Sequence, residues 1–517
     1  MILGIELGST RIKSVLVNKS GTVIATGGYE WENRLENGFW TYSLDEVEAG
    51  LQGSFADLKI NYENLSGEKL TSVDAIGISG MMHGYLAFDD KDELLTPFRT
   101  WRNTNTGEAA ELLSRELDFN MPLRWSASHL LQTVINGEEH IERVAFMTTL
   151  AGYVHYKLTG ERVLGMGDAA GMFPLKNGEF DAERLAKFDN LLKNKFGVDK
   201  KLGNLLPKIL PAGEVAGRLT EDGARFLDPT GSLSCGVPFC PPEGDADTGM
   251  VATNSVRKGT GNVSAGTSAF AMFVLEKSLS KAYPEVDIAA TPDGSDVAMI
   301  HVANCTSEIN AWAELFSEVL ALGGVNMSKS ELFTALFEKS RECDADVGGL
   351  TSFNFLSGEH VWGLAEGRPM VIRHPSGKLD LASFMKSQIY SAVASLRRGM
   401  DILSSEGVSV SEMCGHGGYF KTPVIGQSAM SAALKAPITV MDNAGEGGAW
   451  GMALLALYCL EGGAKIRSLA DFLDGIFGDV KKTTVSADAD EVARFERYME
   501  RYGVAVAAER VAADVLK

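Results

Sequence analysis

The chain has 517 residues, of which 45% are apolar and 22% charged, a composition typical of a soluble globular protein with room for two or more domains. The formal net charge of −20 excludes nucleic acid as a general partner, although it leaves room for a local cationic site that binds a nucleotide. The chain contains no apolar run of about 18 residues, so the sequence predicts no membrane span. The N-terminus has no basic segment and no cleavage pattern, and we therefore expect a cytoplasmic protein.

Six cysteines are scattered along the chain without a CxxC pair. This spacing favours reduced thiols over disulfides or a zinc site, because no histidine or further cysteine accompanies the two closest ones, Cys235 and Cys240. Reduced thiols agree with a cytoplasmic location.

The first 28 residues predict three short strands, at residues 2–7, 11–17 and 22–28, which form an antiparallel meander. The first connection, "GST" at residues 8–10, exposes backbone N–H groups and small hydroxyls with no bulky side chain in the way. Such a turn can hold phosphate oxygens, although a single one is usually a plain hairpin connection.

The segment "SGMMHGY", residues 79–85, follows a short apolar run that predicts the end of a buried strand. His83 therefore lies at the mouth of a strand, where α/β proteins often bind ligands. The alternative is a core histidine with satisfied hydrogen bonds, and these seven residues alone favour that alternative.

The middle of the chain alternates helical patterns with short apolar strands. Residues 106–117 and 182–196 carry apolar side chains at helical spacing with charges between them. Residues 206–220 are rich in proline and glycine, so they predict a connector.

Residues 236–252, "GVPFCPPEGDADTGMVA", predict the crossing between two domains, at residues 1–244 and 245–517. Asp245 follows a strand-like stretch and precedes a predicted helix. It is either a helix cap or a general base at a strand end that faces a cleft. Asp247 competes for either role.

A second hairpin is predicted within "GTGNVSAGTSAFAMFVL", residues 259–275, where Gly266, Thr267 and Ser268 repeat the glycine–hydroxyl turn of residues 8–10. Two such turns, each near the start of one half of the chain, suggest a duplicated fold that closes on one polyphosphate from both sides.

Two glycine clusters follow. Gly415, Gly417 and Gly418 let the backbone pass beneath a flat ligand such as adenine, although most such clusters are plain loops. A second cluster leads into an apolar helix, where close helix packing is the expected role of Gly451 and is undecided for Gly447 and Gly448; it also includes Gly445. Charged, amphipathic residues from about 465 onward predict helices that cover the second domain.

Together these stretches resemble the FGGY carbohydrate kinases, of the sugar kinase, actin and heat-shock chaperone superfamily, and most closely their xylulokinase-like branch. The resemblance runs over about 460 residues in the family's order. It rests on "GIELGSTRIK", "GISGMMHG", "GMGDAAGMF", "EGDADTG", "SAGTSAF", "FLSGE" and "CGHGG". It implies an α/β fold of two ribonuclease H-like (actin-like ATPase) domains of duplicated topology, which flank a central cleft, with sugar bound by residues 1–244 and nucleotide by residues 245–517.

The resemblance also implies transfer of the ATP γ-phosphoryl group to a sugar hydroxyl, with ATP and Mg²⁺ as cofactors and a small sugar as partner. Asp245 is then the catalytic base and contacts the sugar together with Met82 and His83. Glu6 is the implied metal residue. The implied nucleotide-binding residues are Gly8, Ser9, Thr10, Lys13, Gly266, Thr267, Ser268, Gly415, Gly417 and Gly418.

This chain departs from the family at three places. Glu6 stands where the family usually has Asp, Ala246 stands where xylulokinases commonly have Asn, and residues 360–377 fit the pattern poorly. A ketopentose such as xylulose or ribulose is the favoured substrate, with a hexulose, polyol or sugar acid as alternatives. Two other classes remain open: an actin- or chaperone-like ATP-driven switch, and a sugar-binding protein that has lost turnover. A homodimer is left open as well.

Overall fold

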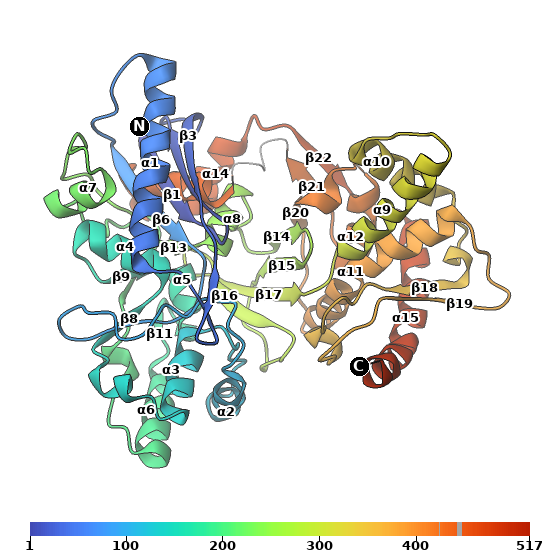
Figure 1. The fold of residues 1–517 in the computed structure, drawn as a ribbon, viewed down its shortest axis with the longest axis horizontal. Helices are drawn as coiled ribbons and strands as arrows, with labels where there is room; N and C mark the ends of the chain where they lie inside the picture. Colours follow the sequence, from blue (N-terminus) through green and yellow to red (C-terminus); the bar gives the residue numbers. More distant parts are fainter. Residues whose placement is uncertain (423, 442–446, 517) are drawn as a thin grey trace.

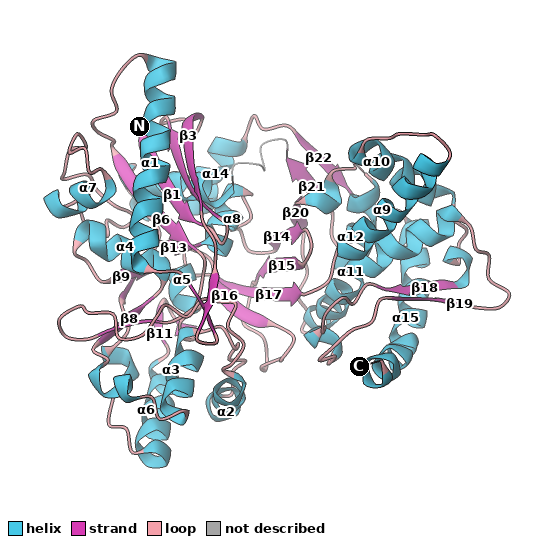
Figure 2. Ribbon diagram, viewed as in Figure 1, coloured by secondary structure: helices cyan, strands magenta, loops and turns pink. Residues whose placement is uncertain are grey.

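The computed structural model describes residues 1–422, 424–441 and 447–516, and it contains two halves, each built on a β-sheet (Figure 1). Helices surround both sheets, so the fold is α/β, as predicted (Figure 2). Within the described residues, no helix combines the length and the apolar character that a membrane span requires.

The first sheet has the strand order β13-β6-β1-β2-β3. Strands β1, β2 and β3 form the predicted antiparallel meander, and β6 and β13 extend the sheet in parallel to β1. These strands are β1 (Ile2–Leu7), β2 (Arg11–Val17), β3 (Val23–Glu30), β6 (Ala75–Gly80) and β13 (Glu243–Gly244).

The second sheet has the order β16-β17-β15-β14-β20-β21-β22. Its segment β17-β15-β14-β20-β21 repeats the first sheet, because three antiparallel strands are again followed by two parallel ones. The predicted duplication is therefore confirmed. The strands are β14 (Thr260–Ala265), β15 (Ala269–Val274), β16 (Asp287–Ala290), β17 (Asp296–Val302), β20 (Glu412–His416), β21 (Ile438–Met441) and β22 (Lys482–Val485).

Shorter strands form four pairs in the first half and one in the second. They are β4 (Arg34–Glu36) with β5 (Phe39–Thr41), β7 (Leu86–Phe88) with β8 (Phe146–Thr148), β9 (Val163–Gly165) with β12 (Lys208–Leu210), β10 (Leu175–Lys176) with β11 (Glu179–Phe180), and β18 (Leu350–Phe353) with β19 (Met370–Arg373).

Helix α1 packs across β3 and β2, and its boundaries follow from local chemistry. Ser43 and Glu46 form a capping box at its start, and Gly67 ends it with a left-handed φ of 74°. The helices of the first half are α1 (Leu44–Ser66), α2 (Gly107–Leu117), α3 (Ser126–Ile135), α4 (Leu150–Thr159), α5 (Met166–Ala170), α6 (Ala182–Phe196), α7 (Glu221–Leu227) and α8 (Asp245–Ala252).

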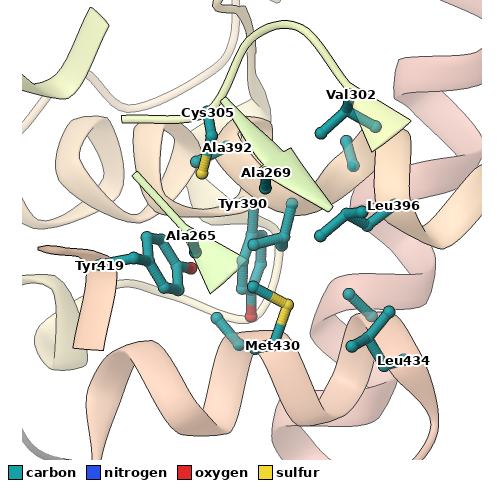
Figure 3. Packing of buried hydrophobic residues seen from close by; sticks show 14 of the residues in the cluster. Ala265, Ala269, Val302, Cys305, Tyr390, Ala392, Leu396, Tyr419, Met430 and Leu434 are labelled. Carbon is teal, nitrogen blue, oxygen red and sulfur yellow. The ribbon is translucent and has the colours of Figure 1, made fainter. Parts of the chain in front are cut away.

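The second half contains the remaining α-helices of the described chain. Three of them, α11, α12 and α15, enclose a large apolar core with the second sheet. Figure 3 shows its packing, where Tyr390 and Leu396 of α11 and Met430 of α12 meet the small side chains of β14 and β15. These helices are α9 (Ser307–Leu322), α10 (Lys329–Lys339), α11 (Leu381–Ser405), α12 (Ile425–Leu434), α13 (Gly447–Leu460), α14 (Leu469–Phe477) and α15 (Ala489–Val515).

Helices α8 and α13 pack on one another, and α13 also packs on β1, although it belongs to the second half of the sequence. The approach is close enough to require glycine. A Cβ on Gly4 would lie 2.1 Å from the Ala449 carbonyl oxygen, and one on Gly451 would lie 2.1 Å from that of Thr248. Close helix packing is thus confirmed for Gly451, while Gly445 lies outside the described residues.

The two C-terminal helices, α14 and α15, pack in different places. Helix α15 covers the second half, as predicted, whereas α14 packs on α13 through aromatic contacts to Trp450 and Tyr458. Helix α14 thereby joins an apolar cluster that also contains Ile2 and Val15 of the first sheet.

Candidate active site

Met82 and His83 lie in the loop after β6. The His83 backbone has a φ of 70°, in the left-handed region that residues other than glycine adopt uncommonly. Its Nδ1 lies 3.2 Å from the carbonyl oxygen of Gly171, and Gly171 has to be glycine because a Cβ there would lie 2.6 Å from the same nitrogen.

His83 is neutral in this setting. Burial, followed by the positive charge of Arg124, holds the pKa of its imidazole well below the usual range. A neutral imidazole that faces a carbonyl oxygen carries its hydrogen on Nδ1, so Nε2 is left as a hydrogen-bond acceptor.

Asp245 is the first residue of α8, and its Oδ1 accepts hydrogen bonds from the backbone N–H groups of Met82, at 3.2 Å, and Ala246, at 3.0 Å. The residue at the helix cap is Gly244, not Asp245. Burial is the main cause that raises the pKa of the Asp245 carboxyl. The end of β6 and the start of α8 thus bring Met82, His83 and Asp245 together.

Asp247 occupies a different environment, although it is only two residues away. Its side chain is completely buried, and neither carboxylate oxygen has a hydrogen-bond partner among the described residues. It lies against Gly167, since a Cβ on Gly167 would be 2.2 Å from the Asp247 Cγ, and Gly244 lies next to both Asp247 and Met82. The structure therefore separates the two aspartates that the sequence left in competition.

Asp247 belongs to a buried acidic cluster with Asp168 and Glu243. The Asp168 N–H donates to Glu243 Oε2 at 3.0 Å, and the Thr149 hydroxyl donates to Asp168 Oδ2 at 2.5 Å. Burial raises the pKa of all three carboxyls, and that of Asp168 reaches about 7. Mutual repulsion adds to this effect, so the cluster holds protons near neutral pH.

Glu6 lies on β1 opposite Lys13 of β2, and its Oε2 accepts a hydrogen bond from the Ala449 N–H at 3.2 Å. Burial and the nearby Asp245 raise the pKa of Glu6 to about 7. A Cβ on Gly448 would lie 2.5 Å from Glu6 Oε1, so this glycine makes room for the carboxylate.

Glu6 fits the role of a Mg²⁺ residue. A carboxylate buried beside a second one has a raised pKa that a nearby cation would lower, and Mg²⁺ commonly binds proteins through one or two carboxylates plus substrate phosphates. Among the described residues, no three His, Cys, Asp or Glu side chains are grouped to hold a metal on their own.

The two predicted glycine–hydroxyl turns lie at equivalent places in the two sheets. Gly8, Ser9 and Thr10 connect β1 to β2, and Gly266, Thr267 and Ser268 connect β14 to β15. Of the adenosine candidates, Gly417 lies beside the second turn, because a Cβ there would be 2.4 Å from the carbonyl oxygen of Ala265; its φ of 105° also requires glycine.

The other two adenosine candidates differ. Among the described residues, no atom would lie within 4 Å of a Cβ on Gly418. Gly415 packs against Phe420 and Ile438, where a Cβ would lie 2.8 and 3.0 Å from their side chains. Packing alone is thus sufficient reason for a glycine at position 415.

Sequence reasoning missed three residues from distant loops, one beside the first glycine–hydroxyl turn and two that link this half to the second half near His83. Trp101 is 40% exposed and donates its indole N–H to Ser9 Oγ at 3.2 Å. Arg124 forms an ion pair with Asp287 of the second half, and Asn120 donates to the same carboxylate at 2.9 Å. A tryptophan in the polar stretch "RTWRNTN" is the one signal that the sequence offered.

Comparisons with known proteins extend over the whole fold. The model "FGGY family of carbohydrate kinases, N-terminal domain" matches residues 1–251, and the corresponding C-terminal domain model matches residues 261–460. Xylulose kinase of Haemophilus influenzae is 22% identical over 441 residues, which cover 82% of this chain and 83% of that protein.

Two solved structures share the fold at low identity. Xylulose kinase from Rhodospirillum rubrum aligns with a TM-score of 0.80 at 16% identity over 99% of both chains. Gluconate kinase from Lactobacillus acidophilus aligns with a TM-score of 0.78 at 17% identity, over 99% of this chain and 98% of that one.

Proposed function

Because this chain belongs to the FGGY family of carbohydrate kinases and is a sugar kinase, we propose that it transfers the γ-phosphoryl group of ATP to a hydroxyl of a ketopentose such as xylulose or ribulose. The observation that carries the proposal is the convergence of Met82, His83 and Asp245 where β6 ends and α8 begins.

In this proposal Asp245 accepts the proton of the attacking hydroxyl. Two backbone N–H groups hold Oδ1 of its carboxylate, which leaves Oδ2 for the sugar. Burial raises the pKa of Asp245, which makes its carboxylate a better proton acceptor than a fully solvated one. Phosphoryl transfer otherwise asks for positioning and charge neutralisation rather than covalent chemistry.

His83 and Met82 orient the sugar. The Nδ1–H of His83 is held by Gly171, so Nε2 accepts a hydrogen bond from a sugar hydroxyl. The thioether of Met82 covers an apolar face of the ring or chain. Neutral groups at these two positions suit an uncharged ketose, and this favours it over a sugar acid.

The turns at residues 8–10 and 266–268 contact the β and γ phosphates in this proposal, Lys13 adds a positive charge, and the glycines at 415, 417 and 418 underlie adenosine. Glu6 would hold Mg²⁺, which when bound neutralises charge on the transferred phosphoryl group.

The domain boundary at residues 244 and 245 remains a prediction. Six unpaired cysteines support the proposed cytoplasmic location.

The test is ADP release by the full chain with ATP and Mg²⁺, in the presence and absence of single sugars. The panel contains D-xylulose, L-xylulose, D-ribulose, L-ribulose, D-fructose, glycerol and D-gluconate. The proposal predicts ADP release that depends on sugar and a kcat/KM that is largest for one of the four pentuloses. ADP release without sugar would indicate a nucleotide-driven switch, and no release at all would indicate a protein without turnover. A preference for fructose, gluconate or glycerol would overturn the ketopentose assignment.

A further inference from the structure

The turn at residues 8–10 is held from behind by aromatic side chains. The indole N–H of Trp31 donates to the carbonyl oxygen of Gly8 at 2.7 Å, and the hydroxyl of Tyr42 donates to the carbonyl oxygen of Ser9. The two rings stack with a centroid separation of 4.1 Å, and both side chains are more than nine-tenths buried. We call Trp31 and Tyr42 the aromatic brace.

The brace determines where the amide groups of the turn point. In a planar trans peptide the C=O and N–H point in opposite directions, so a carbonyl held on one side sends the following N–H to the other. The carbonyls of Gly8 and Ser9 face the brace, so the N–H groups of Ser9 and Thr10 face away from it. Across residues 1–422, 424–441 and 447–516, neither N–H has an acceptor.

The second turn has the same arrangement with different donors. The N–H and hydroxyl of Thr306 both donate to the carbonyl oxygen of Gly266, at 3.0 and 2.7 Å, and the Cys305 N–H donates to that of Thr267 at 2.9 Å. In the described chain, the N–H groups of Thr267 and Ser268 likewise have no acceptor. At equivalent places in a duplicated fold, two unrelated sets of donors thus bind the carbonyl oxygens of the turn and leave its following N–H groups without an acceptor in the described chain.

Trp101 contacts the side chain of the first turn. Its indole N–H donates to Ser9 Oγ, so the hydroxyl of Ser9 acts as acceptor on that side and its own hydrogen is left to donate elsewhere. A turn with two amide hydrogens on one side and its carbonyl oxygens on the other, and with a hydroxyl that can still donate, offers donors suited to phosphate oxygens.

We propose that Trp31 and Tyr42 are positioning residues for phosphoryl transfer, because they hold the Gly8 and Ser9 carbonyls away from the nucleotide and so aim the Ser9 and Thr10 amides at its phosphates. This inference rests on the proposed function. Without the brace, either peptide can rotate and present a carbonyl oxygen, whose partial negative charge repels phosphate.

The experiment compares Tyr42→Phe with Tyr458→Phe in the full chain. Each substitution removes one tyrosine hydroxyl that donates to a backbone carbonyl, Ser9 in the first case and Arg467, at 2.8 Å, in the second. Thermal unfolding of the two variants and steady-state kinetics with ATP and D-xylulose are measured, and ATP binding is measured by calorimetry without sugar. Trp31→Phe, which removes the donor to Gly8, is the second test variant.

Tyr42→Phe and Trp31→Phe should each raise the KM and the Kd for ATP about two- to tenfold, the range expected for one neutral hydrogen bond, while the KM for D-xylulose changes less than about twofold. Tyr458→Phe should lower the melting temperature about as much as Tyr42→Phe does, but it should leave the KM and the Kd for ATP unchanged. If the wild type binds ATP and both test variants bind it equally well, the brace is refuted alone. If the wild type binds no ATP, the proposed function and the brace are refuted together.

Discussion

The buried carboxyl of Asp168 should make the protein less stable as the pH rises. Its side chain is fully buried, and burial, with a smaller contribution from Asp245, raises the pKa from 3.8 to about 7. The folded protein therefore holds a proton that the unfolded chain releases near pH 4. Stability is unaffected below about pH 4, falls between pH 4 and 7, and stays reduced above pH 7.

Asp168→Asn removes this dependence. The amide is neutral at every pH, and its oxygen can still accept the hydrogen bond from Thr149. Two pKa units of the shift lie between pH 5 and pH 7, so the stability of the variant relative to the wild type should rise by about 3 kcal/mol between pH 5 and pH 8. With an unfolding entropy of ~2 cal/mol/K per residue, this corresponds to about 2–3 °C in melting temperature for a chain of this size.

The assay is thermal unfolding of wild type and variant at half-unit steps from pH 5 to pH 8. Asp222→Asn is the matched control, because its side chain is 94% exposed and pairs with Arg225 on the surface. The melting temperatures of control and wild type should run in parallel. A difference between Asp168→Asn and wild type that stays constant with pH would refute the reasoning that Asp168 is protonated in the native state.

Two further substitutions test packing and substrate binding. His83→Ala should raise the KM for the best ketose about two- to tenfold with a smaller change in kcat, because it removes one neutral hydrogen bond; an unaltered KM with a lowered melting temperature would mean that His83 is a core residue. Gly451→Ala should lower stability by about 1–3 kcal/mol, since its Cβ would lie 2.1 Å from the Thr248 carbonyl oxygen; a melting temperature equal to that of wild type would contradict the close packing of α13 on α8.

Local patterns predicted the strands and the turns well. Strand β1, its turn and strand β2 are adjacent in sequence, and two short runs rich in Val, Ile and Leu with a glycine-containing connection specify such a hairpin without help from the rest of the chain. The recurrence of the same pattern at residues 259–275 predicted the duplicated sheets, because each copy was recognisable on its own.

The interior of the site depended on contacts that no local pattern contains. Asp245 and Asp247 are the same residue type, two positions apart. Only the packing of α5 and β6 around α8 buries Asp247 and leaves Asp245 beside Met82. Trp31, Tyr42 and Trp101 come from three separate loops, and their common target at Ser9 and its neighbour follows from tertiary structure alone.

The central claim is that Asp245 accepts a proton from a sugar hydroxyl during phosphoryl transfer. The most direct test replaces Asp245 in one variant and its neighbour Asp247 in another. The measurement is kcat for ATP-dependent phosphorylation of the best ketose by Asp245→Asn and Asp247→Asn, with ATP binding and thermal unfolding as checks of the fold. We predict that Asp245→Asn lowers kcat by about 10²–10⁴-fold while it still folds and binds ATP, and that Asp247→Asn stays within about tenfold of wild type. Turnover by Asp245→Asn close to that of wild type would contradict the account.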